Sequence, residues 1–300
     1  MRAWPRIALA GLILCGALVG VGAGVAGSNA PKLRYIALGD SFSSGEGVPP
    51  FRPGTDKLLP VHNQCHRSFR GYPALIAGRR SSPGTWGFWA CSGALTTDMT
   101  RTNHENPGEI AQLDRIAPPG SSDPRVNLVT LTIGGNDAQF GSVTMACVFA
   151  RLLPGLEDCQ FDWRPRVKAA IARLRTTLPA VYRTIHARAP NARILVLGYP
   201  NPFPVSVPAL SKCRIWLESE DIRFFHDEVN ALNVSVRAAA RASARANVTY
   251  LAPTGFGGHD ACSESPWFNG LDIVPTNFRY SFHPNVLGQR RLAKIALAAL

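Results

Sequence analysis

The sequence predicts an α/β fold in which a parallel sheet carries helices on both faces. The first observation is a set of five short apolar segments, at roughly residues 33–38, 86–91, 126–133, 193–199 and 247–251. The second observation is that segments with helical periodicity alternate with them. Strands that alternate with helices are typical of a three-layer α/β/α sandwich built on a parallel sheet.

The third and fourth apolar segments predict the centre of this sheet. Residues 126–133 and 193–199 are rich in β-branched and apolar side chains. Strands buried on both faces have this composition.

Three segments predict helices. In residues 163–189, apolar side chains recur at helical spacing, at Val167, Ile171, Leu174, Leu178, Val181 and Ile185. Asp162 is the expected N-cap of this helix, and Pro179 is expected to kink or split it. The same spacing recurs in residues 219–246, and residues 284–300 predict a last helix that opens with a proline.

Long loops follow most of the strands. They cover roughly residues 42–71, 138–161, 200–217 and 252–282. Because open α/β sheets bind ligands at the carboxyl ends of their strands, these loops are expected to surround a functional site.

The N-terminus predicts a secretory signal peptide over residues 1–30. Arg2 and Arg6 supply a basic region, residues 7–26 are apolar and small, and cleavage is expected at about residues 26–30. The remaining residues, 31–300, contain no repeat and no low-complexity linker, so they predict one domain. The protein is therefore expected to be secreted. The alternative is an uncleaved membrane anchor, since the apolar stretch is near spanning length.

The chain is basic, with a formal net charge of +12. Removal of Arg2 and Arg6 with the signal leaves 12 − 2 = +10, because residues 1–30 contain no acid. Such a charge attracts anionic lipid surfaces. No nucleic-acid partner is expected, because the arginines are dispersed and form no basic stripe interleaved with aromatic side chains.

The cysteines also indicate export. One of the 7 lies in the signal, and six remain, at Cys65, Cys91, Cys147, Cys159, Cys213 and Cys262. An even number in an exported chain predicts three disulfides, for which the sequence alone allows about fifteen pairings. No spacing matches a metal site, and no metal or organic cofactor is expected.

Three motifs carry residues that suit ester hydrolysis. Ser41, in Gly-Asp-Ser after the first strand, is a candidate nucleophile. Asn136, in Gly-Gly-Asn-Asp after the third strand, has a side-chain amide that can donate to an oxyanion, as can the backbone N–H of Gly93. His283, in Ser-Phe-His-Pro-Asn at residues 281–285, is the candidate base. Each motif has a plainer interpretation, since such residues also make turns, helix caps and pocket fillers. Trp267 and Phe268 are candidates for the wall of an acyl pocket or for anchors of a loop.

Taken together, the motifs resemble those of the SGNH hydrolase superfamily, the GDSL-type esterases and lipases. The resemblance covers residues 33–300 in the family's order and is strongest to secreted actinobacterial lipases and esterases with three disulfides. It implies a five-stranded, flavodoxin-like sheet. It also implies the bridges Cys65–Cys91, Cys147–Cys159 and Cys213–Cys262.

The resemblance also implies roles for the motif residues. Ser41 would attack the ester carbonyl, and His283 would accept its proton. The backbone N–H groups of Ser41 and Gly93 and the side chain of Asn136 would form the oxyanion hole. The substrate would be an acyl ester or lipid, and the protein is expected to be a monomer.

One position departs from the family pattern. Many members carry an aspartate three residues before the histidine, where this chain has Tyr280. The nearest upstream acids are Asp272 and Glu264. We therefore expect the backbone carbonyl of Tyr280 to orient His283 in a Ser-His dyad, and Asp40 to order the nucleophile turn.

The sequence leaves the substrate open. A lipase or esterase that cleaves acyl esters is the leading hypothesis. A polysaccharide acetylesterase is the alternative, followed by a catalytically silent binding module of the same fold.

Overall fold

The computed structural model describes Met1 and residues 33–58, 62–152, 159–206, 211, 213 and 217–300. Residues Lys32–Leu300 form one compact unit. The expected signal peptide, apart from Met1, lies outside the described residues. Within the described parts of the chain, no helix combines the length and apolarity needed to span a membrane.

The sheet has five parallel strands in the order β2-β1-β3-β4-β5, which confirms the predicted fold class. The strands are β1 (Tyr35–Ala37), β2 (Trp86–Phe88), β3 (Leu128–Leu131), β4 (Arg193–Leu197) and β5 (Val248–Leu251). Their registers pair Ala37 with Phe88 on one side and with Thr130 on the other. The order reverses between β1 and β3, and ligands of doubly wound sheets bind at this switch point.

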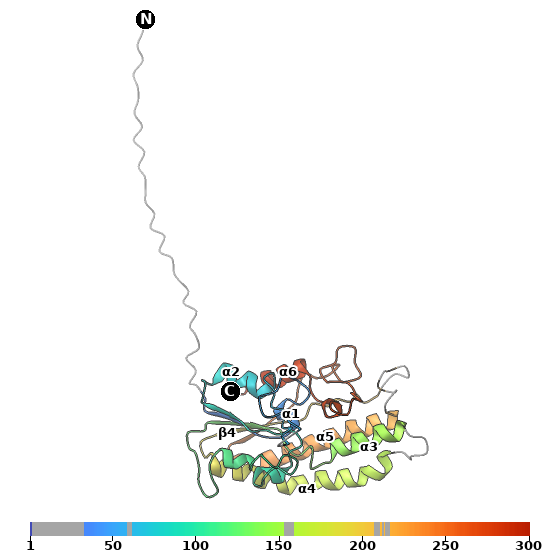
Figure 1. Cartoon of the computed structure of the whole chain (residues 1–300), viewed down its shortest axis with the longest axis horizontal. Helices are drawn as coiled ribbons and strands as arrows, with labels where there is room; N and C mark the ends of the chain where they lie inside the picture. Colours follow the sequence, from blue (N-terminus) through green and yellow to red (C-terminus); the bar gives the residue numbers. More distant parts are fainter. Residues whose placement is uncertain (2–32, 59–61, 153–158, 207–210, 212, 214–216) are drawn as a thin grey trace. The chain divides into compact units, whose positions relative to one another are not determined.

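Helices cover both faces of the sheet (Figure 1). Helices α2 (Tyr72–Arg80) and α6 (Val286–Ala298) pack together on one face. Helices α3 (Phe140–Leu152), α4 (Cys159–Arg188) and α5 (Ser219–Ala242) lie on the other. On α5 the apolar positions predicted from the spacing are buried: Ile222, Phe225, Val229, Leu232 and Val236.

The sequence misplaces parts of the helical layers. Helix α4 begins at Cys159, so Asp162 lies inside its first turn and does not cap it. Of the two outcomes expected at Pro179, the split does not occur: the helix runs through it as one element, with Leu178 and Pro179 buried against the core, whose packing outweighs the lost backbone hydrogen bond. Helix α2 was not predicted, and α3 occupies residues predicted as a loop.

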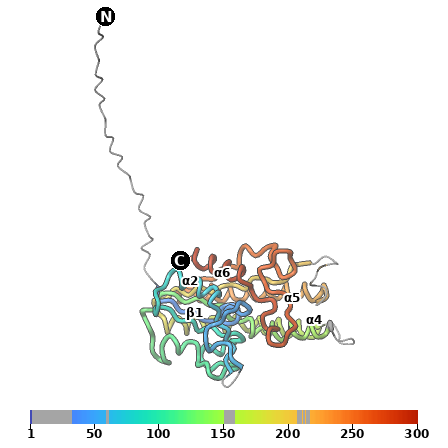
Figure 2. Tube along the Cα trace, turned by 45° about the horizontal axis from the view of Figure 1, so that its top comes forward, coloured from blue at the N-terminus to red at the C-terminus, as the bar shows by residue number. Residues whose placement is uncertain are grey.

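Four strand ends carry the segments that meet at the candidate site. The short helix α1 (Ser41–Ser44) follows β1, Gly93 follows β2, and Asn136 follows β3. Tyr199 lies just after β4. The described residues also contain 3₁₀ turns in the connecting segments, at Thr96–Met99, Gln112–Arg115 and Phe278–Tyr280. Another, Ala244–Ala246, follows α5. The segment before α6 returns beside the segment after β1, although more than two hundred residues separate them (Figure 2).

Candidate active site

The nucleophile turn is formed by a glycine and a helix cap. Gly39 has φ +118°, and a Cβ there would clash with the Thr132 carbonyl oxygen, so only glycine fits between β1 and β3. Asp40 then caps α1 by accepting a hydrogen bond from the Phe42 amide at 3.1 Å. Asp40 therefore orders this turn, as the sequence predicted. Ser41 opens the helix with 7% of its surface exposed.

Ser41 and His283 meet across the molecule. The Ser41 Oγ lies 2.7 Å from His283 Nε2. His283 Nδ1 lies 3.2 Å from the Ser281 carbonyl oxygen. Since a carbonyl only accepts, Nδ1 carries the proton and Nε2 is free to accept the serine hydroxyl. This is the geometry of a serine nucleophile beside its general base.

The carbonyl that faces His283 differs from the prediction by one residue. The expected carbonyl, that of Tyr280, instead accepts the backbone N–H of His283 at 3.2 Å and the Asn269 side-chain amide at 3.3 Å. Phe282 has φ +61°, and this turn presents the Ser281 carbonyl to the ring instead. Among the hydrogen bonds of the described residues, none joins a carboxylate to Nδ1. Asp272, the nearest upstream acid, accepts from the Val274 amide at 3.0 Å.

The protonation state of His283, the candidate base, depends on its burial. Burial lowers the pKa of His283 below its ordinary value of 6.5. The negative charge of Glu46 and the Ser281 carbonyl raise this pKa and offset part of the effect, while the charge of Arg279 lowers it. A lowered pKa keeps His283 neutral, and therefore able to accept a proton, at neutral pH.

Besides Ser41 itself, Gly93 and Asn136 are candidate oxyanion donors, and both line the cavity that holds Ser41 and His283. Gly93 has φ +81°, a left-handed conformation that favours glycine, and a Cβ there would displace the Glu105 carboxylate. One N–H of the Asn136 amide donates to the Ala94 carbonyl at 3.0 Å. The amide group has two donors, so one remains for a ligand.

A buried polar network that the sequence did not predict lies behind the candidate nucleophile. Asp40 is 1% exposed, and its carboxylate accepts hydrogen bonds from Thr132 at 2.6 Å and from the hydroxyl of Tyr199. The Tyr199 hydroxyl in turn accepts from the Gly135 amide at 3.0 Å. Burial raises the pKa of Asp40 to about 6, although these donors lower it. The position of Tyr199 directly after a central strand was the available signal.

The loops that carry Gly93 and Asn136, the candidate oxyanion donors, are joined by Asp137. Its carboxylate accepts from the Thr96 hydroxyl at 2.6 Å and from the Thr96 amide at 3.0 Å. Thr96 lies three residues after Gly93, and Asp137 directly follows Asn136. The network therefore fixes the two loops relative to one another.

The cavity has a volume of about 690 Å³. One part of its wall is apolar and includes Phe140, Met145, Phe149, Phe203, Val229 and Leu232. Trp267 and Phe268 are not among the residues that line it. Phe268 is buried, and Trp267 stacks on His259 with ring centroids 3.9 Å apart, so both anchor a loop.

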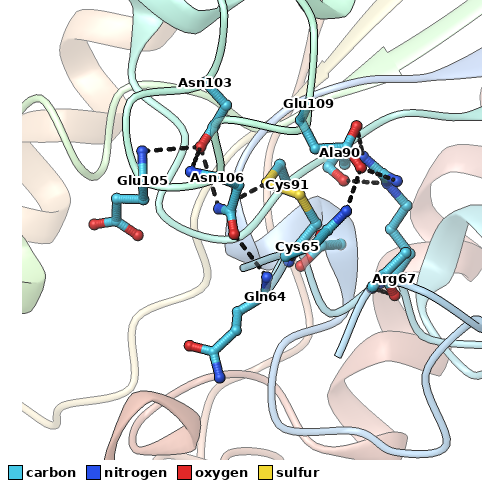
Figure 3. Close-up of a disulfide and its surroundings, with 12 residues drawn as sticks. Gln64, Cys65, Arg67, Ala90, Cys91, Asn103, Glu105, Asn106 and Glu109 are labelled. Carbon is cyan, nitrogen blue, oxygen red and sulfur yellow. Dashed lines mark hydrogen bonds and ion pairs between the residues drawn. A yellow bond between two sulfur atoms is a disulfide. The ribbon is translucent and has the colours of Figure 1, made fainter. Parts of the chain in front are cut away.

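The three disulfides confirm the pairing implied by the family resemblance: Cys65–Cys91, Cys147–Cys159 and Cys213–Cys262. Cys91 of the first bridge lies two residues before Gly93, and Asn106, which also donates to Asn103, donates to its sulfur at 3.3 Å (Figure 3). Disulfides of this kind are typical of proteins in oxidising compartments. In the described part of the chain, Cys147, Cys159 and Asp221 bring potential metal ligands within 4.8 Å of one another. Both sulfurs of that group belong to a disulfide and are not available as thiolates.

Relatives of known activity match nearly the whole chain. A lipase of Streptomyces rimosus is 35% identical over 97% of this chain and 96% of its own. Lipase 2 of Streptomyces coelicolor is 34% identical over 90% of this chain and 86% of its own. Among solved structures, phospholipase A1 from Streptomyces albidoflavus has a TM-score of 0.68 with 27% identity, covering 89% of this chain and 98% of that one. The extracellular lipase of S. rimosus has a TM-score of 0.67 with 29% identity, and the match covers 90% of this chain and 100% of that one.

The family profile gives the same assignment. The GDSL-like lipase/acylhydrolase family matches residues 37–291, which include the nucleophile turn and the histidine. The chain therefore belongs to the GDSL-like lipase/acylhydrolase family and is a carboxylic ester hydrolase.

Proposed function

We propose that this protein is a secreted lipase or esterase that cleaves acyl esters with a Ser41–His283 dyad. The observation that carries the proposal is the 2.7 Å contact between Ser41 Oγ and His283 Nε2. It supports direct proton transfer from the hydroxyl to the imidazole.

In the first half of the reaction, Ser41 Oγ attacks the ester carbonyl carbon as its proton passes to His283 Nε2. The carbonyl oxygen becomes an oxyanion and accepts hydrogen bonds from the N–H groups of Ser41 and Gly93 and from Asn136. The intermediate then collapses and breaks the bond to the alcohol oxygen. His283 gives its proton to that oxygen, and an acyl-serine remains.

In the second half, water attacks the acyl-serine. His283 Nε2 accepts the proton of the water, and the same donors receive the second oxyanion. Collapse releases the carboxylic acid and returns the proton to Ser41 Oγ. The Ser281 carbonyl holds Nδ1–H throughout, so the imidazolium is stabilised by a neutral acceptor on this side.

A series of nitrophenyl esters with acyl chains from two to sixteen carbons tests this function. We expect turnover that favours chains long enough to occupy the apolar wall around Phe140 and Phe203. A sharp optimum at acetate would favour a deacetylase, and no turnover on any ester would favour a binding module.

Two variants accompany the series. Ser41→Ala, with a wild-type unfolding curve, is expected to lose turnover. The matched control is Ser121→Ala, an exposed serine that is not among the residues lining the cavity, and it should retain full activity.

Secretion is the second part of the proposal. The basic and apolar character of residues 1–30 and the three disulfides of the rest of the chain support export. N-terminal sequencing of protein recovered from culture medium is expected to give a start between residues 27 and 31. Recovery only in membranes, with the N-terminus intact, would favour an anchor.

The remaining expectations concern partners. A formal charge of +10 after cleavage (12 − 2) supports attraction to anionic lipid surfaces, and a monomer is expected in solution. Binding to anionic vesicles should weaken as salt rises. Light scattering at several protein concentrations measures the oligomeric state.

A further inference from the structure

The wall of the catalytic cavity is chemically divided. The apolar part is formed largely by α3 and neighbouring side chains, whereas His104, Glu105 and Arg279 bring charge to the same cavity. The catalytic reaction needs only Ser41, His283 and the oxyanion donors. The charged residues are therefore unused by the mechanism, although they line its cavity.

Arg279 and Glu105 form an open ion pair. Arg279 Nη2 lies 3.7 Å from Glu105 Oε2, which is beyond hydrogen-bond distance. The two side chains are 31% and 42% exposed. Exposed ion pairs of this kind are weak, so a ligand that offers a better partner to each charge can separate them.

The backbone on either side of this pair is fixed. Arg279 Nη1 donates to the Gln64 side chain at 3.0 Å. The Gln64 amide donates to Asn106 at 2.6 Å, and Asn106 also donates to Cys91 Sγ at 3.3 Å. Figure 3 shows Gln64 and Asn106 beside the disulfide, with the Glu105 carboxylate pointing away from it. The Glu105 amide donates to Asn103 at 3.1 Å, so the backbone that carries the carboxylate is held in place and a ligand need not order it.

The pair also lies beside the reacting position. The Glu105 carboxylate occupies the space that a Cβ on Gly93 would fill, and the Gly93 N–H is an expected oxyanion donor. An ester carbonyl at Ser41 and Gly93 that sends its acyl chain along the apolar wall must send its alcohol part in another direction. The charged part of the wall remains for that alcohol.

We propose that Arg279 and Glu105 form a subsite for the headgroup of a zwitterionic glycerophospholipid, a substrate assignment that rests on the proposed function. Arg279 binds the phosphodiester, because a guanidinium offers parallel donors to phosphate oxygens. Glu105 binds the ammonium group of the same headgroup. A neutral alcohol group leaves Arg279 paired with Glu105. A zwitterionic headgroup instead offers an opposite charge to each of the two side chains.

The test compares substrates with the same acyl chains in mixed detergent micelles at pH 8, where His283 is neutral. They are phosphatidylcholine, phosphatidylglycerol and diacylglycerol. The measured quantity is kcat/KM on each phospholipid divided by kcat/KM on diacylglycerol. Effects of a variant on the shared chemical steps cancel in this ratio.

Arg279→Gln is expected to lower the ratio about tenfold for both phospholipids, because both carry the phosphodiester. Glu105→Gln is expected to lower it for phosphatidylcholine and not for phosphatidylglycerol, which has no ammonium group. Arg279→Lys keeps the positive charge but loses the parallel N–H donors of the guanidinium group, so it should give an intermediate ratio. The controls Arg125→Gln and Glu264→Gln change exposed charges outside the cavity wall and should keep the ratios of the parent enzyme.

Ratios that are unchanged in Arg279→Gln, or a Glu105→Gln effect equal on both phospholipids, would overturn the assignment. A parent enzyme that hydrolyses diacylglycerol but not phosphatidylcholine would overturn it as well and leave the proposed function standing. A parent enzyme that hydrolyses no ester would contradict the proposed function itself.

An inhibition assay separates a headgroup site from a general anion site. Soluble glycerophosphocholine is expected to inhibit the parent enzyme, and to do so less in Arg279→Gln. Inorganic phosphate that inhibits as strongly as glycerophosphocholine would show an anion site only and overturn the headgroup assignment.

Discussion

The hydroxyl of Tyr199 donates a hydrogen bond to the buried carboxylate of Asp40, the residue directly before the candidate nucleophile. The same hydroxyl accepts from the Gly135 amide, directly before Asn136. One side chain from the end of β4 therefore links the nucleophile turn to the loop of a candidate oxyanion donor.

Tyr199→Phe is expected to lower both stability and turnover. The variant removes a donor from Asp40 and an acceptor from Gly135, and leaving buried polar groups unpaired costs about 1–3 kcal/mol. Urea denaturation and kcat measure the two effects. Tyr250→Phe, which removes a 3.3 Å hydrogen bond to Asn233, is the matched control. Wild-type values in both measurements for Tyr199→Phe would contradict the linking role.

Asn136→Ala is expected to lower kcat by about 10²–10³-fold with little change in KM. The reason is that a side-chain oxyanion donor acts mainly on the transition state. Steady-state kinetics on a nitrophenyl ester measure both constants. Asn191→Ala, which removes an exposed hydrogen bond to the Pro124 carbonyl, should behave as the parent enzyme. A kcat within threefold of the parent would exclude Asn136 from the oxyanion hole.

The acid limb of the pH profile of kcat/KM is expected below 6.5. His283 acts as a base only when neutral, and burial lowers its pKa, so activity persists as the pH falls to about 6.5 and is lost below that. Glu46 raises this pKa and Arg279 lowers it. Glu46→Gln should therefore move the limb to still lower pH. A shift to higher pH would show that the Glu46 charge does not act on His283.

Asp272→Ala is expected to keep most of the turnover. Nδ1 of His283 faces the Ser281 carbonyl, and the Asp272 carboxylate accepts from the Val274 amide instead. Kinetics on the folded variant measure the effect. A loss of turnover in a folded Asp272→Ala protein would mean that a carboxylate orients the base and that the dyad is wrong.

Removal of the Cys65–Cys91 disulfide is expected to cost stability and activity together. The bridge spans 26 residues and, by loop entropy, contributes about 3.5 kcal/mol. It also precedes Gly93, so the double alanine variant should lose turnover below its unfolding transition. The Cys147–Cys159 bridge spans 12 residues, and its double alanine variant should lose about 2.8 kcal/mol. Equal retention of activity in both variants would show that the first bridge does not support the oxyanion loop.

The sequence by itself predicted the elements whose signals are local. Five apolar segments predicted the five strands, because buried parallel strands need continuous apolar runs. Ser41 and His283 lie in motifs that are common singly. Their occurrence together in one chain is typical of ester hydrolases. The disulfide pairs followed from the family resemblance, and the structure confirms them.

Only the tertiary structure decided what depends on backbone turns and on long-range packing. The carbonyl that faces His283 belongs to Ser281 because of the left-handed turn at Phe282, which no local pattern indicated. Helix α4 passes through Pro179 because the core holds it. The meeting of Arg279 with Glu105 likewise joins segments far apart in the chain. Residue types fix which chemistry is available, and packing fixes which of those groups meet.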